Sequence, residues 1–244
     1  MMEEPRNLRK FKSDFNELDR FFTQEVNGQE GHFKDNMLEF LRLNPRYSHL
    51  KNDIDYINDV RKIIVHKEDM EGVPVVPTDA LCKKLEDILN KIKNPPKWES
   101  IAIKKEKIYS CSEDNLILDV IKVMAENTYT HVPVVKDGIF QWLLSESIYV
   151  QWLSEVIEKE GICTTESTIS QLKKYVKKTN DDYLFLSRDA DIYLIREKFE
   201  KAIQERKGEV SKRLGVIFIT NSGKQTEKIL GLITAWDLGK IEDK

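Results

Sequence analysis

Apolar residues recur at steps of three and four through the first third of the chain. The clearest stripe consists of Leu8, Phe11, Phe15, Leu18, Phe22 and Val26. This spacing places apolar side chains on one face of an α-helix. The same period returns at about 33–41, 47–66 and 79–92, and turn-forming or proline-containing stretches separate the segments. The pattern predicts an antiparallel bundle of four helices with short connections.

From Trp98 onward, short apolar runs of strand length alternate with helical segments. The run from His131 to Val135 is followed by Asp137-Gly138, a hairpin turn signal, and by the strand-like "IFQWLLS". A second series begins at Asp182–Ser187 and continues through a helical segment, "LGVIFIT", "ILGLIT" and "AWDLGK". "WESIAI" and "KIYSCS" also have strand-like composition. The order predicts two β-α-β-β-α repeats.

The 244 residues are enough for two domains. We place a helical domain at 1–94 and a second domain at 98–244, whose repeats span about 98–160 and 168–244. The predicted fold class is therefore α+β, with an N-terminal antiparallel helical bundle followed by the two repeats.

The second domain resembles a tandem pair of CBS domains. In the first repeat, "YSCSEDNLILDVIKVMAENTYTHVPVV" is similar to the family's strand–helix–h-P-V-V core, and in the second, "GLITAWDL" is similar to its G-h-h-T-x-x-D-h ending. The second repeat departs from the family pattern in its long charged stretch at 201–213 and in lacking the core proline. The resemblance implies a module that forms homodimers. Its clefts would hold an adenine nucleotide (AMP-, ADP- or ATP-like) or an adenosyl compound as regulatory ligand. No cofactor would be required.

The resemblance also implies roles for particular residues of the second repeat. Gly231 would allow close approach of backbone and ligand, Thr234 would meet a phosphate, and Asp237 would accept the ribose hydroxyls. Tyr183 or Phe185 would wall the base. A competing interpretation needs no ligand, because Thr-x-x-Asp at a helix start is also a capping box.

The first repeat lacks the same ending. "QWLLSESI" aligned with "GLITAWDL" puts Ser147 in the place of the aspartate, and a shift by one puts Ile148 there. Neither register supplies a carboxylate, so we expect one competent ribose site, in the second repeat. His131 could contact phosphate, or it could be a packing residue with a satisfied ring.

One residue of the helical domain breaks its apolar stripe. Arg61 lies between Ile57 and Ile64 on the third predicted helix, so its guanidinium is expected to be buried with a partner. The segment "RKIIVH" resembles the R-x4-H signature of HEPN domains, which implies a metal-independent endoribonuclease with Arg61 and His66 at its site. This chain has Lys62 where that family has Asn, Asp or His. The alternatives are an Arg–carboxylate pair and a histidine placed at a helix C-terminus.

Composition narrows these possibilities. The net charge of −3 gives no general footprint for nucleic-acid binding, although "KKYVKK" clusters Lys173, Lys174, Lys177 and Lys178. That cluster could attract polyphosphate or RNA, or be a solvated face. No apolar run is long enough to span a membrane, and the first ten residues do not resemble a signal peptide. Cys82, Cys111 and Cys163 lack metal-ligand spacing, which indicates reduced thiols and a cytoplasmic protein.

We therefore expect a regulatory protein that binds an adenine nucleotide or adenosyl ligand, with the helical domain as its output or partner-binding module. It is expected not to be an enzyme. One alternative is a HEPN-type RNase gated by the CBS pair, the only interpretation in which RNA is a partner. The other is a non-catalytic dimerisation scaffold.

Overall fold

The computed structural model describes residues 4–67, 75–160, 166–179, 181–204 and 213–241. Contacts divide the chain into two compact units, Met1–Pro96 and Lys97–Lys244. The helices of the first unit and the helices and strands of the second confirm the prediction of mixed helix and sheet. None of the described helices is long and apolar enough to cross a membrane.

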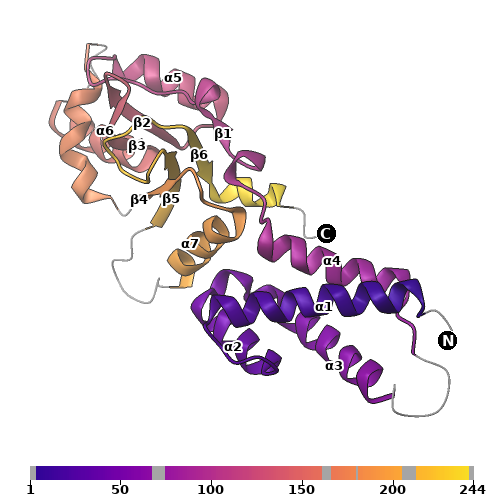
Figure 1. The fold of residues 1–244 in the computed structure, drawn as a ribbon. Helices are drawn as coiled ribbons and strands as arrows, with labels where there is room; N and C mark the ends of the chain where they lie inside the picture. The colour runs from indigo at the N-terminus through magenta and orange to yellow at the C-terminus, as the bar shows by residue number, and fades with distance from the viewer. Residues whose placement is uncertain (1–3, 68–74, 161–165, 180, 205–212, 242–244) are drawn as a thin grey trace. The chain divides into compact units, whose positions relative to one another are not determined.

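The first unit is helical. Its elements are α1 (Arg6–Glu25), α2 (Phe33–Leu43), the 3-10 helix η1 (Pro45–Leu50), α3 (Lys51–Lys67) and α4 (Asp79–Lys93). Helix α1 contacts both α2 and α4, and α3 contacts the same two helices (Figure 1). The predicted stripes are buried, and rings such as Phe15 and Phe33 pack with centroids 4.6 Å apart. Thr78 caps α4 by accepting a hydrogen bond from the Leu81 N–H.

The second unit mixes strands and helices. In chain order its elements are η2 (Trp98–Ser100), β1 (Ile103–Lys104), η3 (Lys105–Lys107), α5 (Ile117–Asn127), β2 (His131–Lys136), β3 (Ile139–Ser145), α6 (Glu146–Glu160), η4 (Ile169–Lys178), β4 (Asp181–Ser187), α7 (Ile192–Gln204), β5 (Arg213–Thr220), β6 (Gly231–Thr234) and η5 (Ala235–Lys240). The predicted strand "KIYSCS" is not a regular strand. Instead, Cys111 alone bridges Val134 of β2 in parallel.

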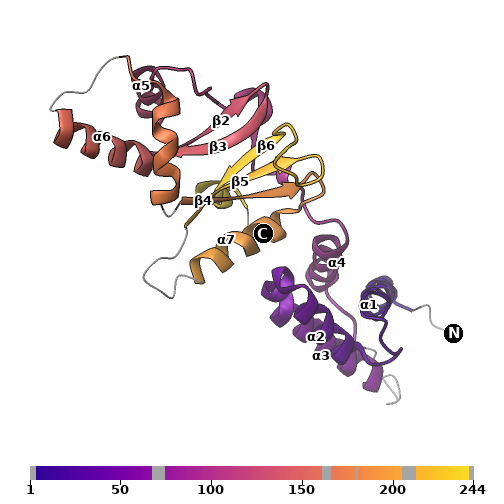
Figure 2. The same cartoon turned by 90° about the vertical axis from the view of Figure 1, so that its left-hand side faces the viewer.

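The strands form two sheets. Strands β2 and β3 make an antiparallel hairpin, turned by Asp137 and Gly138, which both have positive φ. The other sheet has the order β1-β6-β5-β4, in which β4 is parallel to β5 and the rest is antiparallel. A parallel pair needs a crossover, and α7 provides it, packing along β5 (Figure 2). Most of the charged stretch at 201–213 lies outside the described residues.

Strand β3 takes part in two hydrophobic cores. Trp142 and Leu144 join a core built by α5, β2, α6 and η4, whereas Phe140 and Leu143 join a core built with β5 and β6. Side chains alternate between the two faces of a strand, and the register shift between the Val134–Trp142 and Val135–Phe140 pairs moves Phe140 onto the face of Leu143. The apolar run of β3 is therefore buried on both sides.

Cys111 lies in the first of these cores. Its side chain is buried, and burial raises the pKa of the thiol to about 12. Cys82 is also a buried free thiol, and the structure of Cys163 lies outside the described residues.

We expect Cys111 to resist alkylation by iodoacetamide at pH 8, because only the thiolate reacts and this thiol stays protonated. Peptide mass spectrometry of labelled folded protein measures each cysteine separately. The same protein labelled in denaturant should be modified at Cys111. Modification of Cys111 in the folded protein, at the rate of the denatured one, would contradict this packing.

Candidate ligand site

A cavity of about 290 Å³ opens in the second unit. We call it the first cavity. Tyr109, Tyr129 and His131 from the first predicted repeat line it, together with Leu232, Thr234 and Trp236 from the second. Its wall is therefore composite, and residues more than 100 positions apart meet there. Ligand sites are typically concave and mostly apolar, with a few placed polar groups, and this cavity has that character.

Aromatic side chains give the first cavity flat surfaces. The rings of Tyr109 and Tyr129 are nearly parallel, with centroids 6.2 Å apart. Burial raises the pKa of the Tyr109 phenol, so this ring stays neutral at physiological pH. Trp236 is 89% exposed, whereas Trp98, Trp142 and Trp152 are buried. An indole this exposed at the rim of a cavity is available to cover a planar ligand.

Thr234 and Asp237 form a local cap at the end of β6. The Thr234 N–H and hydroxyl both donate to Asp237 Oδ2, at 2.8 and 2.9 Å. Lys240 donates to Asp237 Oδ1 at 2.6 Å and to the Ile101 carbonyl at 3.0 Å. Thr234 lines the first cavity, whereas the Asp237 side chain is buried and fully engaged. The capping interpretation therefore describes the geometry of Asp237 in this structure, and its ribose role stays a prediction.

Gly231 faces a tryptophan. A Cβ built on Gly231 would lie 2.4 Å from the Trp98 ring, which real side chains do not tolerate. The Trp98 indole is held in turn by donating to the Arg188 carbonyl at 3.0 Å. The close approach predicted at Gly231 therefore occurs, but it is made by the Trp98 ring.

Tyr183 and Phe185 lie away from the lining of the first cavity. Both pack with Phe140 and Phe218 in one aromatic cluster, where the Phe140 and Tyr183 centroids are 4.8 Å apart. Burial raises the pKa of Tyr183. Both rings are partly buried against the core that β4 shares with β3, and their role beside a base stays a prediction.

His131 separates the first cavity from a second one. Its Nδ1 is 2.8 Å from the Thr130 hydroxyl, and its Nε2 is buried without a hydrogen-bond partner. The ring packs onto Gly215, where a Cβ would come within 2.5 Å of Nε2. Burial lowers the pKa of His131, so the imidazole is neutral at pH 7. One ring nitrogen is therefore satisfied, as the packing interpretation expects, and the other has no partner in the structure.

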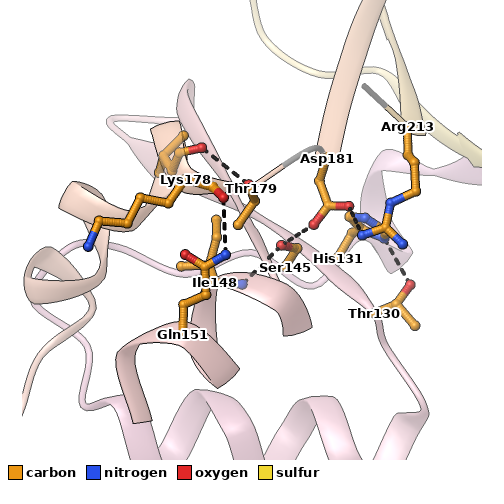
Figure 3. A network of polar contacts seen from close by, with 10 residues as sticks. Thr130, His131, Ser145, Ile148, Gln151, Lys178, Thr179, Asp181 and Arg213 are labelled. Carbon is orange, nitrogen blue, oxygen red and sulfur yellow. Dashed lines mark hydrogen bonds and ion pairs between the residues drawn. The ribbon is translucent and has the colours of Figure 1, made fainter. Parts of the chain in front are cut away.

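The second cavity has a volume of about 210 Å³ and shares Thr130 and His131 with the first. Figure 3 shows Asp181 between the Ser145 hydroxyl, which donates to it at 2.6 Å, and the Arg213 guanidinium at 3.3 Å. Ser145 ends β3, in the predicted repeat that lacks the Thr-x-x-Asp ending. Its hydroxyl nonetheless donates to a carboxylate, which Asp181 of β4 supplies.

Arg61 does not behave as predicted. It is exposed, and its guanidinium lies 5.4 Å from the centroid of the Phe15 ring. Arg61 also stabilises the charge of Asp19, whose pKa is raised by burial. The prediction of a buried guanidinium is therefore wrong, because Arg61 lies at the edge of the apolar stripe. The side chain of His66 lies outside the described residues, so the pairing of these two residues stays a prediction.

The lysines of "KKYVKK" are exposed on η4. Lys173 pairs with Glu113, and Lys174 and Lys178 pair with Glu155. Lys174 and Lys178 also lie over the Tyr175 ring. These contacts favour the solvated-face interpretation. Within the described residues, no group of three or more His, Cys, Asp or Glu side chains could hold a metal ion.

Residues 100–140 match the sequence model of the CBS domain. No curated protein matches the chain. Among similar solved structures is a CBS domain protein from Streptococcus pneumoniae TIGR4, with 16% identity over 67% of this chain and 90% of that chain, at a TM-score of 0.43. Another is CBSX2 in complex with AMP, with 11% identity, 59% and 94% coverage, and a TM-score of 0.40. A third is CbpB in complex with c-di-AMP, with 15% identity, 64% and 91% coverage, and a TM-score of 0.41.

The CBS match falls within the first predicted repeat and supports the resemblance there. The second CBS repeat and the HEPN-like identity of the first unit stay predictions. Sequence reasoning missed most of the residues that line the two cavities, among them Tyr109, Trp236, Asp181 and Arg213. Trp236 lies inside the recognised "GLITAWDL", so its position beside Thr234 was a usable signal. The other three depend on which strand ends meet.

We expect Gly231→Ala to destabilise the second unit by about 1–3 kcal/mol, because the new methyl group overlaps the Trp98 ring. Chemical denaturation measures the change in the free energy of unfolding. Gly239→Ala is the matched control, since a Cβ there meets nothing within 4 Å. Equal stability of the two variants would contradict the close Trp98 packing.

Asp237→Ala should also destabilise the ligand-free protein, by about 0.5–2 kcal/mol, because it removes the carboxylate that caps η5. Thermal unfolding without nucleotide measures this loss. Lys240→Ala removes one charged partner and leaves the cap in place, so it should cost less. A ligand-free Asp237→Ala protein as stable as the parent would show that the cap contributes nothing.

Proposed function

We propose that this protein is a regulatory module that binds an adenine nucleotide or a related adenosyl compound in the first cavity. The observation that carries the proposal is the composite wall, in which Tyr109 and Tyr129 face the same space as Thr234 and Trp236. The CBS match at 100–140 includes Tyr109, Tyr129 and His131, so it covers one side of this wall.

The lining suits a planar base attached to a polar tail. The apolar and aromatic groups, Ile108, Tyr109 and Leu232, can enclose a purine, and Trp236 can stack on it from the rim. The hydroxyls of Thr128 and Thr234 already donate within the chain and can accept hydrogen bonds from ribose hydroxyls, and the Thr130 hydroxyl lines the same space. No covalent step is required, so the consequence of binding is a shift in stability or conformation.

Asp237 keeps its proposed ribose role only through an exchange of partners. Its Oδ1 is held by Lys240, whose side chain is 53% exposed. A ribose hydroxyl would replace the ammonium group at that oxygen while Oδ2 continues to cap Thr234. Nucleotide affinity of the Asp237→Ala protein, measured below its melting temperature, separates this role from capping alone.

The helical first unit is proposed as the output or partner-binding part. Tyr56 and Ile63 of α3 are large apolar side chains exposed on its surface, and a partner could cover them. Homodimer formation stays a prediction from the CBS resemblance, and the endoribonuclease activity stays a prediction from Arg61 and His66.

Titration with adenosine, AMP, ADP and ATP should change the tryptophan fluorescence, because Trp236 is exposed at the cavity whereas the other three tryptophans are buried. The same ligands should raise the melting temperature. A ligand at 100 times its dissociation constant adds about 2.7 kcal/mol to the stability.

Trp236→Phe should remove most of the fluorescence change while keeping the thermal shift. Guanosine nucleotides test base selectivity at the same concentrations. An unchanged melting temperature with every adenine compound at millimolar concentration would overturn the proposal and favour the scaffold alternative.

A further inference from the structure

Two acidic side chains, Asp181 and Glu146, line the second cavity, whereas the described lining of the first cavity has none. Among the described residues that line it, the charged groups are Asp181, Glu146 and Arg213, and His131 is neutral. The fixed charges therefore sum to one net negative charge. A ligand whose tail enters this space meets one guanidinium that is already paired with a carboxylate.

The two cavities share Thr130 and His131, so they adjoin at these two residues. Guanidinium groups bind phosphate strongly, through paired N–H donors. A base enclosed by Tyr109 and Trp236 can therefore extend its phosphates past Thr130 toward Arg213. Ser145 and Ser147 add hydroxyls along the same path.

The Asp181–Arg213 pair is built so that it can open. Its one close contact is 3.3 Å long, and the Arg213 side chain is 52% exposed. A single long contact to a half-exposed guanidinium makes a weak ion pair. Asp181 itself is only 10% exposed and stays anchored by the short bond from Ser145. A phosphate can therefore draw Arg213 away, but Asp181 remains beside it as a repelling charge.

We propose that Asp181 is the specificity-determining residue that limits the negative charge of the ligand. It competes with phosphate for Arg213 and repels each further phosphate, so the site prefers adenosine compounds with none or one phosphate over ADP and ATP. This inference rests on the proposed nucleotide site in the first cavity.

The test is calorimetric titration of adenosine, AMP, ADP and ATP into the full chain and its variants. Asp181→Asn keeps an oxygen that accepts from Ser145 and removes the charge. It should tighten ATP binding by about tenfold and AMP binding by about threefold, with less than a twofold change for adenosine. Arg213→Gln should weaken AMP binding by about tenfold and leave adenosine unchanged.

Two control variants show where the phosphates lie. Glu146→Gln removes an equal charge from the same cavity but leaves the Asp181–Arg213 pair intact, so its effect should be smaller than that of Asp181→Asn. Lys107→Gln removes the cation that lines the first cavity. If Lys107→Gln weakens AMP binding and the Asp181 and Arg213 variants do not, the phosphates point the other way and the inference fails.

The outcomes also separate this inference from the proposed function. If adenosine and AMP bind and the ratio of their affinities is the same in all variants, the proposed role of Asp181 is overturned. The proposed nucleotide site is retained in that case. Absence of binding by every ligand overturns both. Melting temperatures of the variants identify any that fail to fold. In place of such a variant, the affinities of Asp181→Glu are compared with those of the parent. Asp181→Glu keeps the charge and should retain the parental ranking of the four ligands.

Discussion

The second unit depends on the burial of β3 on both of its faces. Trp142 and Leu144 pack into the core that α5 and α6 cover, and Phe140 and Leu143 pack against β5 and β6. A strand buried on both faces cannot slip by one residue, because a slip would exchange every side chain between the two cores. The register of β3 thus fixes where Ser145 ends the strand. It also fixes the distance between the first repeat and the strand ends of the second, between which both cavities lie.

Buried carboxylates at those strand ends are satisfied from within the chain. Asp237 receives Thr234 and Lys240 from its own turn, whereas Asp181 receives Ser145 and Arg213 from two different strands. A carboxylate in such a position without any hydrogen-bond donor would cost several kcal/mol. The local pair could be recognised as Thr-x-x-Asp in the sequence. The distant pair could not, because its members are separated by more than 30 residues and meet only when the sheets pack.

Periodicity predicted most of the elements, since it records which faces are buried. The stripes of α1 and α4, the β2–β3 hairpin and the strand runs of β4 and β5 all follow their apolar residues. The prediction from periodicity failed where a side chain lies at the edge of the apolar face of a helix. Arg61 was assigned to the apolar stripe of α3 but is exposed over Phe15, because an angular position alone does not say how wide the partner surface is. Periodicity also could not decide which of Tyr183 and Phe185 faces a ligand, and in the structure both rings pack partly buried against the core of β3.

The same packing explains why the cavities are composite. Gly231 and Gly215 lack side chains where Trp98 and His131 press against the sheet, so each glycine admits a ring from outside its own strand. Trp98 thereby brings the start of the second unit onto β6, and His131 brings the start of β2 onto β5. The cavity walls are consequently held by contacts between segments distant in sequence. A ligand that fills them would bind the folded arrangement and not the unfolded chain, so its binding energy adds directly to the cohesion of the two repeats.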